Sequence, residues 1–82
     1  MVTIVRKHGF AVIIYKDDHP PPHVHLIGIG RAKINLIGSD GSPQLVKAYD
    51  LSVGDVRKAM RIVNDNQFLL LQKWKEIHGG TI

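Results

Sequence analysis

Two short runs of alternating residues around a Gly-Ile-Gly turn constrain the fold of this chain more than any other feature. Polar and apolar side chains alternate in residues 31–37 and again in 23–27, which is the pattern of strands with one buried face. A three-residue loop at 28–30 aligns the apolar positions of both runs, whereas a two-residue loop would place His25 opposite Ile34. The expected pairs are Val24 with Ile34, Leu26 with Ala32, His23 with Asn35, and His25 with Lys33. The polar face of this hairpin then carries His23, His25, Arg31 and Lys33.

Further strands are expected on both sides of the hairpin. Residues 2–7 predict one strand, and the continuously apolar, β-branched residues 10–16 predict a central strand that is covered on both faces. Three consecutive prolines, at 20–22, exclude a central strand between this run and the hairpin, because proline lacks a backbone donor. Residues 44–49 predict one more strand.

The last third of the chain has the pattern of an amphipathic helix. Ser52 can cap its first turn, and Asp55 can answer it in an acidic variant of the capping box. The poor helix formers at 64–66 leave one long helix or two shorter ones open. Apolar residues at helical spacing, with one polar exception, form a stripe that must be buried on the sheet: Val56, Ala59, Met60, Val63, Gln67, Leu70, Leu71, Trp74 and Ile77.

The expected fold class is therefore α+β. A small antiparallel sheet of four to five strands has a C-terminal helical segment packed on one face. We expect a single domain over residues 1–82, with the sheet in 1–50 and the helical part in 52–78.

Composition narrows the classes of function. The chain has no cysteine, which excludes disulfides and cysteine-ligated metals. No apolar run reaches the roughly 18–20 residues that cross a bilayer, and no signal peptide is evident, so we expect a cytoplasmic protein without a membrane partner. Eleven Lys and Arg against seven Asp and Glu give a net charge of +4, which makes RNA or DNA a partner worth testing.

Residues 17–25 carry the strongest functional signal, since three of the five histidines lie within seven residues. His23 and His25 are two apart on a strand and share a face, so they can chelate one divalent ion such as zinc or nickel. His19 joins them only if the proline loop turns back. Asp17 or Asp18 offers an oxygen ligand.

The same residues also fit acid–base chemistry on a phosphodiester. One histidine would accept a proton from the attacking hydroxyl while another donates one to the leaving oxygen. Arg31 and Lys33 would stabilise the charge on the phosphate. A rigid loop whose imidazoles bond backbone carbonyls explains the histidines without any chemistry, and this alternative stays open.

The eight residues from Asp18 to His25 closely resemble the signature Asp-His-x-Pro-Pro-His-Phe-His of small prokaryotic proteins called domain of unknown function 4160. Residues 70–74, Leu-Leu-Gln-Lys-Trp, are similar to the family's Leu-Leu-x-x-Trp, and the resemblance covers nearly the whole chain. Val24 replaces the usual Phe, and Ser52-Val53 replaces a common Leu-Pro helix start. Neither change touches a histidine.

The resemblance implies no settled biochemical activity. Members look like halves of two-gene cassettes and have been proposed as toxins of toxin–antitoxin pairs. On that analogy the partner is a small antitoxin-like protein encoded by a neighbouring gene. The motif positions expected to matter are Asp18, His19, His23 and His25.

Three hypotheses follow, and whether the chain is an enzyme stays open. The first is a toxin-like protein that binds or cleaves nucleic acid, with His19, His23 and His25 catalytic and Arg31 and Lys33 binding phosphate. The second is a divalent-metal domain with Asp18, His19, His23 and His25 as ligands, although no cofactor is certain. The third is a non-catalytic module that binds a protein partner. An exposed sheet edge would also permit a homodimer.

Overall fold

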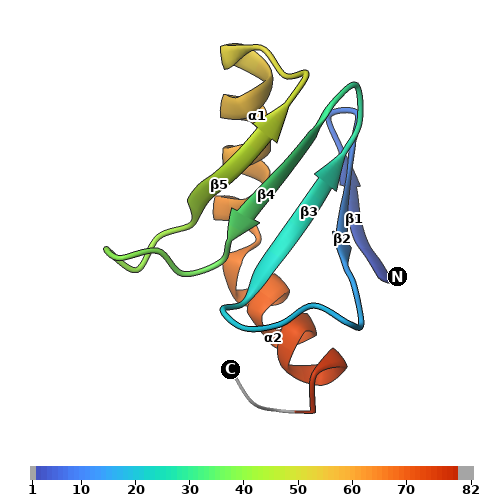
Figure 1. The fold of residues 1–82 in the computed structure, drawn as a ribbon, viewed down its shortest axis with the longest axis vertical. Helices are drawn as coiled ribbons and strands as arrows, with labels where there is room; N and C mark the ends of the chain where they lie inside the picture. The colour runs from blue at the N-terminus through green and yellow to red at the C-terminus, as the bar shows by residue number, and fades with distance from the viewer. Residues whose placement is uncertain (1, 80–82) are drawn as a thin grey trace.

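A computed structural model describes residues 2–79 and confirms the α+β fold (Figure 1). Five antiparallel strands form one sheet in the order β1-β2-β3-β4-β5, so that every strand pairs with its neighbours in sequence. Two strands end two residues earlier than predicted, at Ile14 and Asn35. The elements are β1 (Val2–Lys7), β2 (Phe10–Ile14), β3 (His23–Ile27), β4 (Arg31–Asn35), β5 (Gln44–Tyr49), α1 (Val53–Asp65) and α2 (Gln67–Ile77).

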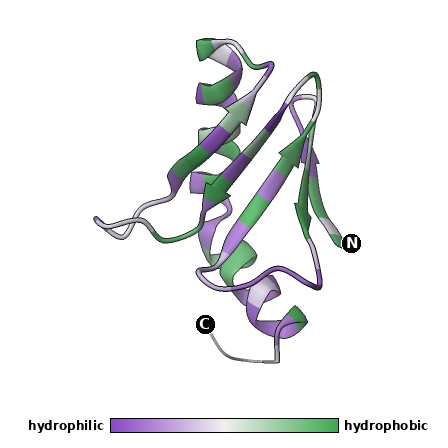
Figure 2. Ribbon diagram, viewed as in Figure 1, coloured by the Kyte–Doolittle hydropathy of each residue, from purple (hydrophilic) through white to green (hydrophobic). Residues whose placement is uncertain are grey.

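The β3–β4 hairpin has the predicted register. Val24 pairs with Ile34, and His25 pairs with Lys33, across a loop of three residues. The even-numbered residues of both strands are buried, and hydrophobic and hydrophilic residues alternate along them in Figure 2. A slip of one residue would exchange the two faces, so burial of one face is what determines this register.

The helical part consists of two helices that meet at Asn66, which settles the alternative that the sequence left open. Asn66 has φ −117° and ψ 17°, and its side-chain amide donates to the carbonyl of Ile62. Such side-chain bonding to the backbone competes with helix continuation, as expected for asparagine. At the start of α1, Ser52 and Asp55 form the predicted capping box.

Both helices lie on the same face of the sheet, behind the strands in Figure 1. The core comprises the even-numbered residues of β2, β3 and β4 together with α1 and α2 residues such as Leu70 and Trp74. Ile62 is buried although the predicted stripe omitted it. Gln67, the polar member of that stripe, donates to the carbonyl oxygens of Leu36 and Gly41.

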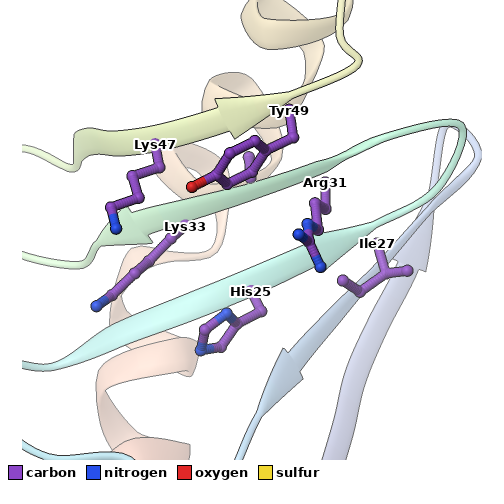
Figure 3. A pocket seen from close by; sticks show the side chains of 7 residues that line it. His25, Ile27, Arg31, Lys33, Lys47 and Tyr49 are labelled. Carbon is purple, nitrogen blue, oxygen red and sulfur yellow. The ribbon is translucent and has the colours of Figure 1, made fainter.

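The opposite face of the sheet is not covered by either helix. It carries the odd-numbered residues of β3 and β4, including His25 and Lys33, and this is the face toward the viewer in Figure 3. Within the described residues, no helix is long and apolar enough to span a bilayer.

Gly30 holds β5 against the hairpin loop, and Gly30→Ala is expected to weaken this contact. A Cβ at position 30 would overlap the carbonyl oxygens of Tyr49 and Asp50. We expect a loss of about 1–3 kcal/mol in the free energy of unfolding, measured by urea denaturation.

Gly54→Ala is the matched control. A Cβ there meets only the Ser52 hydroxyl, at 3.8 Å, and alanine is the better helix former. It should leave the chain as stable as wild type or more so. Equal losses from both substitutions would contradict the close approach at Gly30.

Candidate functional site

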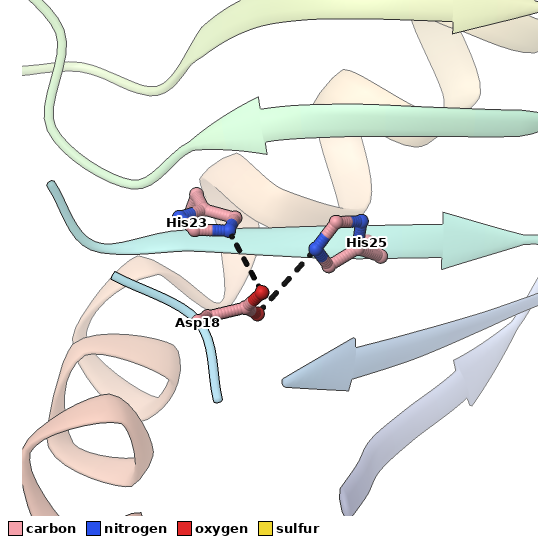
Figure 4. Close-up of side chains that lie close together, drawn as sticks. All are labelled: Asp18, His23 and His25. Carbon is pink, nitrogen blue, oxygen red and sulfur yellow. Dashed lines mark ion pairs between the residues drawn. The ribbon is translucent and has the colours of Figure 1, made fainter. Parts of the chain in front are cut away.

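Asp18, His23 and His25 converge in front of β3 and are called here the histidine cluster (Figure 4). Asp18 comes from the loop after β2, whereas the two histidines lie on β3. Oδ1 of Asp18 lies 3.4 Å from Nε2 of His23, and Oδ2 lies 3.4 Å from Nε2 of His25. One potential ligand atom from each residue lies within 4.8 Å of the others.

A tight turn holds the carboxylate of Asp18 in this position. The backbone N–H of Asp18 donates to the carbonyl of Tyr15 at 3.1 Å, and Oδ2 of Asp18 accepts from the N–H of Tyr15, also at 3.1 Å. Aspartate favours turns because its side chain bonds nearby backbone in this way. The turn reverses the chain before the prolines and so brings Asp18 back toward β3.

His23 is the one buried polar residue among the described residues, with 5% of its surface exposed. Its Nδ1 lies 2.9 Å from the carbonyl oxygen of Pro21, and its ring packs against Trp74 with centroids 5.2 Å apart. The carbonyl can only accept, so Nδ1 carries the proton and the lone pair of the neutral ring is on Nε2. Nε2 is the nitrogen that faces Asp18.

His25 sits between Tyr15 and His23, with ring centroids 4.8 Å and 5.2 Å away. Burial lowers its pKa below the ordinary 6.5, because desolvation penalises the imidazolium, and the charge of Asp18 offsets this only in part. The ring is therefore neutral at neutral pH, and its contact with Asp18 is not an ion pair. Its buried Nε2 has no hydrogen-bond partner within residues 2–79.

His19 does not join the histidine cluster. It is exposed, and although it lines the same hollow as His23 and His25, it is not among the residues whose ligand atoms converge. The structure therefore brings together three of the four motif residues.

Next to His25 the open face of the sheet forms a second hollow of about 250 Å³, called here the cationic pocket (Figure 3). The predicted phosphate ligands Arg31 and Lys33 line it from β4. Lys47 and Tyr49, which the sequence analysis did not single out, line it from β5. Its full lining is His25, Ile27, Arg31, Ala32, Lys33, Lys47 and Tyr49.

Comparison of the sequence with models of known protein families finds a match to one family. The model of a domain of unknown function (DUF4160) matches residues 9–75, which includes both the histidine cluster and the cationic pocket. Searches of curated proteins and of solved structures give no match.

In metal-free protein, the imidazole resonances of His25 should titrate with a midpoint below 6.5 in an NMR titration. The unfolded chain then binds more protons than the folded chain in the window between the lowered pKa and 6.5. The free energy of unfolding therefore falls as the pH decreases through that window.

His25→Gln should remove this part of the pH dependence, measured by urea unfolding above and below pH 6.5. Asp18→Asn removes the charge that raises the pKa of His25 and should move its midpoint lower still. A midpoint at or above 6.5 in wild type would show that Asp18, and not burial, dominates this site.

Proposed function

This chain belongs to the family defined by the domain of unknown function DUF4160, and from the geometry of its histidine cluster we propose that it binds a divalent metal ion. The ligands are Asp18, His23 and His25. The proposal rests on one observation: one potential ligand atom from each of the three residues lies within 4.8 Å of the other two.

The contact between His23 and Asp18 carries this argument. In the neutral ring the proton of His23 is engaged with Pro21, so that Nε2 presents a lone pair to a carboxylate oxygen at 3.4 Å. Two acceptors at this separation repel each other unless a cation lies between them. A bridging proton would draw the atoms to about 2.7–2.9 Å, the usual length of a charge-assisted hydrogen bond.

A metal ion accounts for the longer separation. Ligands bound at about 2.0–2.1 Å in a tetrahedral arrangement are spaced by about 3.3–3.4 Å. Each Asp18–histidine distance, 3.4 Å, agrees with that spacing, although the two involve different carboxylate oxygens, and the three ligand atoms together lie within 4.8 Å of one another. The hydrogen bond from Nδ1 of His23 to Pro21 is also the outer-shell contact that metal-binding histidines commonly make.

The ligand set indicates both the kind of metal and its use. Two imidazoles and one carboxylate suit zinc, nickel or iron(II), whereas magnesium and calcium prefer oxygen ligands alone. Three protein ligands leave a coordination position open, as in catalytic zinc sites and unlike closed structural ones. The proposed centre therefore binds an exchangeable ligand from solution.

Metal-free acid–base catalysis by His23 and His25 has weaker support. Proton transfer needs a ring nitrogen that reaches a substrate, but Nδ1 of His23 is bonded to Pro21 and the ring is buried. Both Nε2 atoms lie 3.4 Å from the carboxylate of Asp18.

A toxin-like role, a partner encoded by a neighbouring gene, binding of nucleic acid and a cytoplasmic location remain predictions. The family match carries no activity that would test them. A homodimer and a purely structural role for the loop also remain predictions.

Untagged wild-type protein, stripped with a chelator, should bind one zinc ion per chain in isothermal titration calorimetry. Asp18→Asn, His23→Gln and His25→Gln should each weaken binding by more than about 100-fold, since loss of an outer-shell contact alone costs 10–100-fold. Cobalt(II) should quench the fluorescence of Trp74, the only tryptophan, because its ring lies 5.2 Å from that of His23.

Two variants serve as controls. His8→Asn, at a turn residue with φ 51° that asparagine tolerates, should leave zinc affinity unchanged. His19→Gln should also leave it unchanged, and a loss comparable to that of His23→Gln would add His19 to the ligands. Failure of folded wild-type protein to bind zinc, nickel or cobalt would refute the proposal.

A further inference from the structure

The cationic pocket places like charges next to one another across two strands. Lys33 on β4 is directly opposite Lys47 on β5. Arg31 precedes Lys33 by two residues on β4 and therefore lies on the same face. Directly opposed like charges destabilise a sheet, because their Cβ atoms are only about 4.5–5.5 Å apart. The fold tolerates this arrangement at some cost in stability.

No carboxylate offsets these charges within the described residues. Within residues 2–79, the close contacts of carboxylates with basic side chains join Asp18 to the two histidines and Glu76 to Lys73, and none of them reaches the pocket. An anion from solution would reduce the repulsion and gain three cationic partners. This is the electrostatic arrangement of an anion site.

The cationic pocket also has a defined volume and a hydrogen-bond donor, the Arg31 guanidinium, whose position is restricted. The guanidinium of Arg31 lies 4.9 Å from the ring centroid of Tyr49, a cation–π contact that restricts its position. Ile27, which is exposed, contributes apolar surface beside the charges. A hollow of about 250 Å³ has room for a phosphoryl group and part of what it is attached to.

The pocket adjoins the histidine cluster. His25 and Lys33 line the cationic pocket and also the neighbouring hollow that contains Asp18 and His23. A group held by Lys33 and Lys47 therefore lies beside the three proposed metal ligands. In Figure 3 the side chains of His25 and Lys33 project from the same face of the sheet.

We infer that the cationic pocket binds the phosphoryl group of a phosphate ester and presents it to the ion held by Asp18, His23 and His25. The second half of this inference rests on the proposed metal site, whereas binding by the pocket does not. Arginine and lysine pair well with phosphate through charge-assisted hydrogen bonds. The phosphoryl group is either the terminal phosphate of a nucleotide or a backbone phosphate of a nucleic-acid strand.

The test measures binding of a fluorescently labelled single-stranded RNA hexamer, of adenosine 5′-monophosphate and of inorganic phosphate to untagged protein, with chelator and with zinc. Lys47→Glu should weaken binding of the phosphate-bearing probes by about tenfold or more. The same substitution should raise the melting temperature, since a Lys33–Glu pair replaces a Lys33–Lys pair. Lys75→Glu, the same charge change at an exposed site on α2, should change affinity less than twofold.

Lower affinity together with a higher melting temperature in Lys47→Glu distinguishes a ligand site from a structural role. If Lys47 had only a structural role, affinity and melting temperature would both decrease. Zinc should tighten binding of adenosine 5′-monophosphate by about tenfold in wild type. Tighter binding of the RNA than of the nucleotide identifies a strand as the source of the phosphate, and equal affinities identify a single phosphoryl group.

Phosphate binding by the cationic pocket and metal binding by the histidine cluster can be refuted independently of each other. Normal zinc binding with no phosphate binding, or equal effects of Lys47→Glu and Lys75→Glu, would overturn the inference and leave the metal site standing. Phosphate binding in chelator without any zinc binding would support the pocket and refute the metal site. Phosphate binding that zinc does not change would overturn the link between the two.

Discussion

The hydrogen bond between His23 and the carbonyl of Pro21 governs the chemistry of this site. It holds the proton of a buried ring on Nδ1 and so turns the lone pair of Nε2 toward Asp18. The carbonyl is available because three prolines keep the chain from forming a strand there. The prolines thus do more than connect β2 to β3, since Pro21 supplies the acceptor that orients His23, the first proposed metal ligand.

The fold supports this site by covering only one face of its sheet. Both helices pack on the even-numbered residues of β2 to β4, and odd-numbered residues such as His25 and Lys33 lie on the open face. Trp74 joins the two sides, because it lies in the core and also packs against His23. The ring of His78 stacks on Trp74 at 3.9 Å and extends this contact toward the end of α2. Rigid packing behind His23 restricts its ring to one orientation, which favours a preorganised ligand.

The sequence predicted those parts of the structure that depend on the periodicity of apolar residues or on local chemistry. The register of β3 against β4 follows from a period of two and a three-residue loop, so the shared face of His25 and Lys33 was predictable. The capping box was predictable because its chemistry is local.

The remaining parts depend on contacts between distant segments. Nothing in residues 15–22 indicates that Asp18 turns back to β3 while His19 stays exposed, since that path depends on a turn packed against the sheet. Lys47 and Tyr49 were missed because β5 is exposed along its whole length and lacks a clear apolar alternation. The odd-numbered positions of Lys47 and Tyr49 could have indicated that they line the pocket, because pairing of β5 with β4 places Lys47 opposite Lys33.

The most direct test of the proposed metal site is anomalous diffraction at the zinc edge from crystals of the untagged protein grown with zinc. The account predicts an anomalous peak within about 2.0–2.2 Å of Nε2 of His23, Nε2 of His25 and a carboxylate oxygen of Asp18. It also predicts that Nδ1 of His23 stays bonded to the carbonyl of Pro21. A zinc ion bound only at His8, His19 or His78, or a histidine cluster without zinc in such crystals, would contradict it.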